Sequence, residues 1–199
     1  IGSLLDALTE QGAQADSRSF PFTLKTAGLR GGEVSIDASE SSQLLSALIL
    51  VAPNARSPLK VTLKGETVSK PFVTMTENMV RQFSDPMPEY AVEGDASAAS
   101  YFAAHTIVTG STLKIEGLNL ASDALQGDAQ FCHLLKQLGY LNIDGQTFST
   151  GSSRRGTEAD FNAISDTFLT IAAIAPLLDG PTKITGIAHT RKQETDRVS

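Results

Sequence analysis

Apolar residues recur along the chain in two alternating patterns, one of period two and one of helical spacing. The segments 31–37 and 58–65 alternate apolar and polar residues as half-buried strands do, whereas 41–53 and 70–83 repeat apolar residues every three or four positions. Pro53 is expected to stop the first of these helices. The first part of the chain is therefore predicted to run strand, helix, strand, helix.

The same alternation continues to the end of the chain. The further predicted elements are a strand at 89–92, a helix at 95–110, a strand at 111–118, a helix at 127–140, a hairpin around Asp144 and Gly145, a helix at 165–180 and a strand at 182–188. The buried face of helix 70–83 is predicted to contain Phe72, Met75, Met79 and Phe83. Helix starts recur at intervals of roughly 26 to 37 residues, which favours repeated strand and helix modules in an α/β fold.

Composition excludes several functions. With 199 residues, of which 41% are apolar, the chain can bury a sizeable core. The net charge of −6 argues against nucleic-acid binding, and no apolar run approaches the roughly 20 residues of a membrane span. The first residues lack the features of a signal peptide, so a cytoplasmic setting is expected. The single cysteine, Cys132, is expected to be buried, and no Cys/His spacing predicts a metal site.

Two predicted helix starts carry hydroxyl side chains. Ser41 and Ser42 precede one helix, and Ser69 and Lys70 precede the next. Unpaired backbone N–H groups and the helix dipole favour anions at such positions, so each start is a candidate phosphate or carboxylate site. Ordinary helix capping by serine explains the same residues and remains an open alternative.

Two further stretches contain candidate acid/base groups. Asp166 precedes a strongly apolar helix, where it is either an N-cap or an acceptor for a substrate hydroxyl. Near the end of the chain, Glu194 lies among Arg191, Lys192 and Arg197. This cluster is either a solvated helix start or an anion clamp that contains an acid/base carboxylate.

Taken together, the motifs resemble those of the 5-enolpyruvylshikimate-3-phosphate synthase family. The stretches that carry the resemblance, in the order of the family, are IGSLLDAL, DASESSQLLSALIL, GETVSKPF, YAVEGDASAASYF, LQGDAQFCHLLKQLG, DFNAISDTFLTIAAIA and RKQETDR. The resemblance implies an α/β (α+β) fold of repeated βαβαββ units in two similar domains. Residues 1–92 would belong to the first domain and 93–199 to the second.

The resemblance also implies a reaction and its ligands. The family transfers the enolpyruvyl group of phosphoenolpyruvate to the 5-hydroxyl of shikimate 3-phosphate and releases phosphate, without a metal or organic cofactor. The implied catalytic residues are Asp166 and Glu194. The implied substrate contacts are Ser41, Ser42, Gln43, Ser69, Asp166, Gln193 and Arg197. A monomer is expected.

Three departures from the family pattern affect the implied substrate contacts. Phe72 replaces a common tyrosine, Gln193 a common lysine, and His189 a frequent asparagine. The stretch 82–90 is shorter than the family's connection, which ordinarily includes another strand pair, and several cationic family contacts have no counterpart in these residues. We therefore expect a portion of the enzyme that does not catalyse the reaction by itself.

Two alternative functions remain open from the sequence. One is a non-catalytic shikimate-phosphate-binding remnant or scaffold, and the other is a relative of UDP-N-acetylglucosamine enolpyruvyl transferase.

Overall fold

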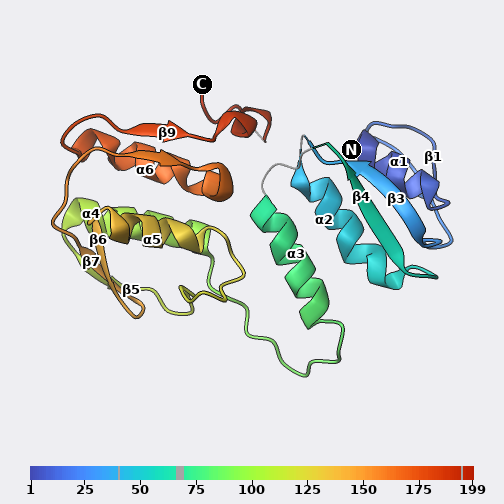
Figure 1. Cartoon of the computed structure of the whole chain (residues 1–199), viewed down its shortest axis with the longest axis horizontal. Coiled ribbons are helices and arrows are strands. Elements are labelled where there is room, and N and C mark those ends of the chain that lie inside the picture. The colour runs from blue at the N-terminus through green and yellow to red at the C-terminus, as the bar shows by residue number, and fades with distance from the viewer. Residues whose placement is uncertain (40, 66–69, 194) are drawn as a thin grey trace. The chain divides into compact units, whose positions relative to one another are not determined.

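The chain forms two compact units. The computed structural model describes residues 1–39, 41–65, 70–193 and 195–199. The first unit is Ile1–Pro88 and the second is Glu89–Ser199. Figure 1 labels their helices and strands. Within the described ranges, no helix combines the length and the apolar character that a membrane crossing requires.

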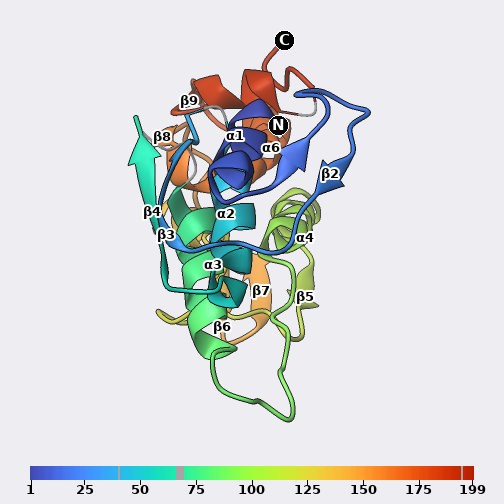
Figure 2. The ribbon, with the colours of Figure 1, turned by 90° about the vertical axis from the view of Figure 1, so that its right-hand side faces the viewer.

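The first unit is built around two parallel strands. Its elements are α1 Gly2–Glu10, β1 Gln14–Ala15, β2 Leu24–Lys25, β3 Gly32–Asp37, α2 Ser42–Val51, the 3-10 turn η1 Ala52–Asn54, β4 Leu59–Lys64 and α3 Lys70–Gln82. β3 and β4 pair in parallel along six residues, and a short antiparallel pair joins β1 to β2. Helices α2 and α3 lie alongside one another in both ribbon views (Figures 1 and 2).

Local chemistry explains the limits of α2. The side chain of Ser41 caps its N-terminus, and the helix ends in the 3-10 turn η1, which contains Pro53. Leu45 and Leu48 on its inner face pack with Val34 and Ile36 of β3 to form the core of the first unit. Strand, helix and strand thus follow the predicted pattern.

The predicted buried face of α3 is only partly correct. Phe83 lies beyond the end of the helix and is 51% exposed, whereas Thr76 is buried. The Thr76 hydroxyl donates a hydrogen bond to the Ser46 hydroxyl on α2 at 3.0 Å. The contact between these helices therefore includes a polar pair that apolar spacing does not reveal.

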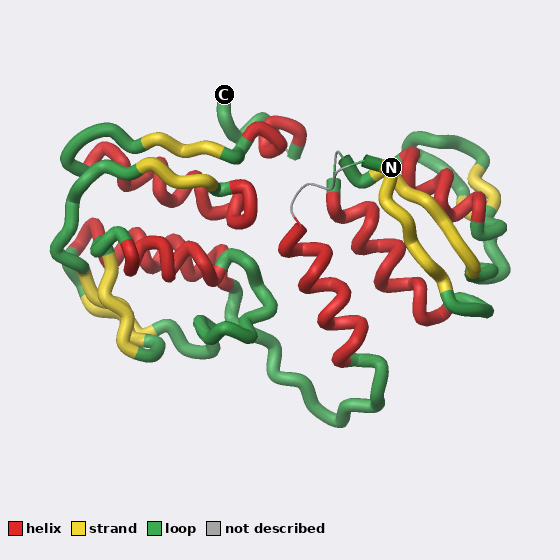
Figure 3. Tube along the Cα trace, viewed as in Figure 1, coloured by secondary structure: helices red, strands yellow, loops and turns green. Residues whose placement is uncertain are grey.

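The second unit contains two small sheets. Its elements are α4 Ala96–Thr109, β5 Thr112–Lys114, α5 Ala129–Gln137, β6 Leu141–Asp144, β7 Thr147–Thr150, β8 Glu158–Asp160, the 3-10 turn η2 Asn162–Thr167, α6 Phe168–Ile174, the 3-10 turn η3 Ala175–Leu177, β9 Lys183–Thr185 and the 3-10 turn η4 Ala188–Lys192. One sheet has the order β5-β7-β6 and is antiparallel, and the other pairs β8 with β9 in parallel. Figure 3 shows the helices of this unit in red and its strands in yellow.

The hairpin differs by one position from its prediction. Asp144 pairs with Thr147, so the two-residue loop consists of Gly145 and Gln146. Gly145 has a φ of +56°, a conformation that glycine adopts at little cost. The hairpin itself is confirmed, and Phe148 on β7 is fully buried in the core of the unit.

The predicted strand 89–92 is wrong. The structure assigns no strand to these residues, and Val92 is 83% exposed. The following Glu93 carboxylate accepts hydrogen bonds from the Asn119 side chain at 2.7 Å and from the Leu125 amide at 3.2 Å. Residues 89–92 have no neighbouring strand in the described part of the unit, and the contacts of Glu93 follow directly after them.

One structural motif occurs in both units. In each, a strand, a helix, a 3-10 turn with the sequence Ala-Pro and a parallel second strand follow one another. Each strand pair carries a glutamate opposite a lysine: Glu33 lies 2.8 Å from Lys60, and Glu158 lies 2.6 Å from Lys183. These four side chains are largely exposed, so they mark equivalent positions and contribute little stability. The repeated module predicted from helix spacing is present.

Candidate functional site

The N-terminus of α2 holds three of the predicted site residues. The Ser41 hydroxyl accepts a hydrogen bond from the Gln43 amide at 3.3 Å, which confirms capping as one role of this serine. Ser42 is buried at 6% exposure, and the Gln43 side chain is exposed. Two hydroxyls and the positive end of a ten-residue helix therefore lie within one turn, and this arrangement suits a phosphate or carboxylate.

Two predicted site residues, Ser69 and Glu194, lie outside the described residues. The helix that follows Ser69, α3, begins at Lys70, as the sequence predicted. Lys70 is exposed. Their proposed contacts therefore remain predictions.

Asp166 is bound by Arg197. The guanidinium Nη1 donates a hydrogen bond to Asp166 Oδ1 at 2.8 Å, and the two residues are 31 positions apart in the chain. Their side chains are 32% and 24% exposed, so the ion pair is partly shielded from water. The structure thus joins two residues that the sequence singled out separately, one as a hydroxyl acceptor and one as an anion clamp.

The alternative role of Asp166 as a helix cap is not observed. Asp166 lies within η2, which is kinked at Ile164, and the N-cap of α6 is Thr167 without a side-chain cap bond. The predicted helix 165–180 is instead a 3-10 turn, a short α-helix and a second 3-10 turn. Because the Asp166 carboxylate is not used for capping, it is available to the Arg197 guanidinium.

A buried carboxylate near Asp166 was not predicted as a site residue. Asp128 is 4% exposed, accepts a hydrogen bond from the Ser97 hydroxyl, and has one oxygen, Oδ1, without a hydrogen-bond partner among the described residues. Burial raises the pKa of Asp128, the bond from Ser97 opposes this shift, and the charges of Asp166 and Asp95 raise the pKa further. Its position directly before α5 was the available signal, but a helix start alone does not reveal burial.

The cationic cluster near the end of the chain is partly neutralised. Arg191 forms an ion pair with Asp196 at 3.0 Å. The Val198 amide, the Ser199 hydroxyl and Arg191 together lower the pKa of Asp196. The side-chain oxygen of Gln193 is buried without a hydrogen-bond partner in the described ranges. Among the described side chains of the predicted cluster, Arg197 contacts a predicted catalytic carboxylate, that of Asp166.

Cys132 and His133 have structural contacts within the second unit. Cys132 is fully buried, and burial raises the pKa of its thiol to about 12, which agrees with the prediction that it packs in the core. His133 Nε2 lies 3.0 Å from the Leu120 carbonyl oxygen. No group of three or more His, Cys, Asp and Glu side chains in the described chain is arranged to hold a metal ion.

The sequence of the chain matches a known family. The family model described as EPSP synthase (3-phosphoshikimate 1-carboxyvinyltransferase) matches residues 1–199. The chain belongs to the EPSP synthase family. The resemblance inferred from the motifs is thus confirmed.

Relatives in the EPSP synthase family are substantially longer than this chain. The 3-phosphoshikimate 1-carboxyvinyltransferase of Opitutus terrae is 45% identical over 219 residues, which cover 98% of this chain and 48% of the relative. That of Serratia proteamaculans is 36% identical over 223 residues, which cover 100% of this chain and 52% of the relative. The chain spans about half the length of these relatives. Because both alignments are longer than 199 residues, each relative also contains residues within the matched region that this chain lacks.

A solved structure confirms the fold class. The structure of EPSP synthase from Acinetobacter baumannii matches with a TM-score of 0.69 at 21% identity, and the match covers 98% of this chain and 50% of that chain. At this level of identity the match establishes the fold. The predicted α/β architecture of the enolpyruvyl transferases is therefore correct.

Proposed function

We propose that this chain provides part of the site that transfers the enolpyruvyl group of phosphoenolpyruvate to the 5-hydroxyl of shikimate 3-phosphate. The observation that carries this proposal is the 2.8 Å contact between Arg197 and Asp166. The family resemblance assigns Arg197 to phosphoenolpyruvate and Asp166 to the shikimate hydroxyls. Their contact supports an arrangement in which the two substrates meet beside one carboxylate.

The residue types suit the chemistry. Both substrates are polyanions, so their binding requires groups that offset negative charge. In the first unit, Ser41, Ser42 and the N-terminus of α2 supply hydroxyls and backbone N–H groups for the shikimate phosphate, and Gln43 adds an amide. In the second unit, Arg197 supplies a guanidinium whose geometry matches a carboxylate or phosphate.

Proton transfer requires two groups with opposite tasks. Addition to phosphoenolpyruvate delivers a proton to its methylene carbon while the 5-hydroxyl loses a proton, and elimination of phosphate removes a proton from that carbon again. We assign the hydroxyl proton to Asp166 and the carbon proton to Glu194. Arg197 contacts Asp166 at 2.8 Å and so fixes the position of the carboxylate that we assign as the base.

The family domains are proposed to divide near residue 92. Residues 1–92 would supply the shikimate-phosphate side, and 93–199 the phosphoenolpyruvate side. Because the chain spans about half of its relatives, a second function, binding of shikimate 3-phosphate without turnover, is a real alternative. A monomeric state is also proposed.

Calorimetry combined with a phosphate-release assay tests these functions. Heat with shikimate 3-phosphate, followed by phosphate release when phosphoenolpyruvate is added, would support the transferase. Heat without phosphate release would support the binding function, and UDP-N-acetylglucosamine serves as the control ligand. If shikimate 3-phosphate produces no heat, the assignment of Ser41, Ser42 and Gln43 is wrong.

A further inference from the structure

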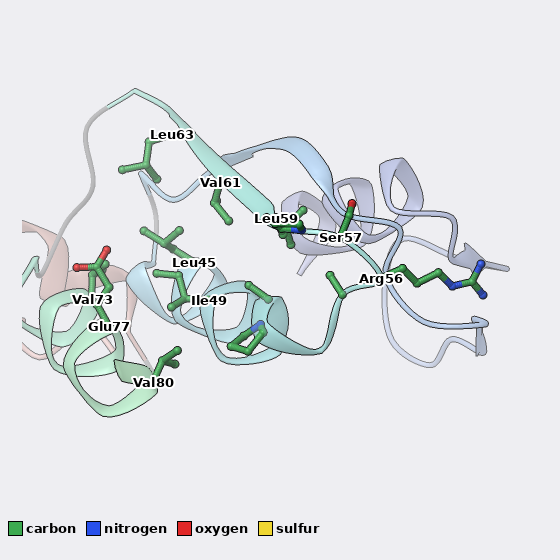
Figure 4. A pocket seen from close by; sticks show the side chains of 14 residues that line it. Leu45, Ile49, Arg56, Ser57, Leu59, Val61, Leu63, Val73, Glu77 and Val80 are labelled. Carbon is green, nitrogen blue, oxygen red and sulfur yellow. The ribbon is translucent and has the colours of Figure 1, made fainter. Parts of the chain in front are cut away.

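The first unit has an open sheet edge that borders an apolar groove. β4 pairs with β3 along one edge, and no described strand of this unit pairs with its other edge. The groove has a volume of about 710 Å³ and lies between β4, α2 and α3. Figure 4 shows Val61 and Leu63 on the side of β4 that faces Leu45 and Ile49 of α2. Leu63, which lines this groove, is 42% exposed.

A different strand of the second unit, β5, shares a short sequence with β4 and has a covered edge. Thr62, Leu63 and Lys64 of β4 have the same sequence as residues 112–114, which form β5. β5 is covered by the antiparallel strand β7, with Leu113 opposite Phe148. Phe148 is fully buried, and Leu113 is half-buried. The covered leucine in one unit thus corresponds to an exposed leucine in the other.

The chain between the units does not supply this strand. In the second unit, α5 is followed by the β6–β7 hairpin, whose second strand returns to β5. In the first unit, α3 is followed by residues 83–88, to which the structure assigns no strand. The relatives described above contain residues within the matched region that this chain lacks. The edge of β4 is therefore left without a strand of the kind that covers β5.

We propose that the open edge of β4 and the adjoining groove bind an extended polypeptide strand from another chain. The strand would pair antiparallel with β4 and place alternate apolar side chains over Val61 and Leu63. Backbone hydrogen bonds to an exposed edge supply the affinity in such complexes, and pockets for alternate side chains supply the specificity.

The chemistry of β4 further defines the partner. Lys60, Thr62 and Lys64 alternate with the groove-facing residues and are exposed on the other face. Lys60 is paired with Glu33. Positively charged residues on the outer face of the partner would be repelled by these lysines, so that face should be neutral or acidic. An aromatic residue is expected opposite Leu63, because Phe148 fills that position against Leu113.

A peptide of this chain's own covering strand tests the proposal. A fluorescein-labelled peptide with the sequence of residues 145–151, GQTFSTG, is titrated with the full chain and followed by fluorescence anisotropy. Saturable binding is expected, and the same peptide with the Phe148→Asp substitution should bind at least about tenfold more weakly, because an unpaired carboxylate would enter the groove. Hydrogen exchange of the amides of residues 59–64 should slow when the unsubstituted peptide binds.

Two protein variants provide a matched pair. Leu63→Asp should weaken peptide binding at least about tenfold. Thr62→Asp adds the same charge on the opposite face of β4 and should leave binding within about twofold of the parent chain. Circular dichroism checks that both variants fold, as expected for exposed positions.

A chain that carries the covering hairpin covalently tests the same pairing without depending on the affinity of a free peptide. Residues 84–88 are replaced by the sequence of residues 138–151, which places the hairpin directly after α3. Slower exchange of the β4 amides, reversed by Leu63→Asp, would support the proposal. The proposal is wrong if hydrogen exchange of the β4 amides is unchanged in this hairpin-bearing chain. It is also wrong if Leu63→Asp leaves peptide binding unaltered. Sedimentation that shows Leu63-dependent dimers in place of peptide binding would overturn it as well.

Discussion

Arg197 and Asp166 form an ion pair at 2.8 Å between the end of the chain and the turn before α6. Each of these residues also has a predicted role toward a different substrate. The pair therefore holds two proposed ligand-binding groups in contact before any ligand arrives. A substrate that binds Arg197 must share or replace the contact with Asp166, so the strength of this pair bears on both stability and binding.

Arg197→Ala should lower the free energy of unfolding of the second unit by about 1 kcal/mol, as expected for a partly exposed ion pair. All three tyrosines, at positions 90, 101 and 140, lie in the second unit, and the chain has no tryptophan. Tyrosine fluorescence during urea unfolding therefore reports this unit selectively. A double-mutant cycle with Asp166→Ala isolates the pair, and a coupling energy near zero would show that the contact contributes nothing.

Substitutions of Ser41 separate helix capping from anion binding. Ser41→Ala should destabilise the first unit by about 1 kcal/mol because the cap is lost. Ser41→Asp retains a good cap but places a negative charge where the shikimate phosphate is proposed to bind. This variant should therefore keep its stability in urea unfolding while losing the heat of shikimate 3-phosphate binding. If Ser41→Asp binds as well as the parent chain, Ser41 is a cap alone.

Asp128→Asn should stabilise the second unit at neutral pH. The folded-state pKa of Asp128 is raised by burial and by the charges of Asp166 and Asp95, so stability is lost as the pH rises through that pKa. The amide removes the charge and keeps an acceptor for the Ser97 hydroxyl. The urea midpoint should rise at pH 7, and the gain should disappear below about pH 4, where the unfolded carboxyl also binds its proton.

The exposed helix cap Asp95 provides the control. Asp95 accepts a hydrogen bond from the Ala98 amide at 2.9 Å, and asparagine is an equally good cap. Asp95→Asn should therefore change the midpoint much less than Asp128→Asn. An unchanged or lower midpoint for Asp128→Asn at pH 7 would mean that burial of this carboxylate costs nothing.

Cys132 links the stability of the second unit to alkaline pH. Burial raises the pKa of the thiol to about 12, whereas the unfolded thiol ionises near its ordinary value of about 8.5. Its contribution to stability is therefore complete below about pH 8.5 and falls by roughly 1.4 kcal/mol per pH unit above it. Comparison with Cys132→Ala across pH 8 to 11 removes the effects of other titrating groups. Parallel pH profiles for the two proteins would contradict this linkage.

Sequence periodicity predicts the elements that carry a clear apolar spacing and a recognisable start or end residue. The spacing of Leu45 and Leu48 located α2, and the glycine after α4 marked its end. The three-residue strand β8 was missed because Glu158 and Asp160 flank a single alanine, so no apolar alternation marks the strand. The strand at 89–92 was predicted in error because apolar alternation does not reveal whether a neighbouring strand exists.

In the candidate site, the sequence likewise reveals the residue types and does not reveal the contacts that tertiary packing creates. Hydroxyls at a helix start and charges near the end of the chain are visible in the sequence, and their specific roles came from the family resemblance. The contact between Asp166 and Arg197 depends on how η2 and the last residues pack, so no local pattern reports it. The burial of Asp128 likewise depends on its packing near α4.

The strand-helix-strand module described in both units has a consequence for folding kinetics. Glu33 and Lys60 are 27 residues apart, and Glu158 and Lys183 are 25 apart. Parallel strands usually form slowly because their partners must meet across long stretches of chain, and in each module a single helical crossover sets that distance. Each module joins its two strands within one contiguous stretch of chain, so the pairing of β3 with β4 requires no residue of the second unit.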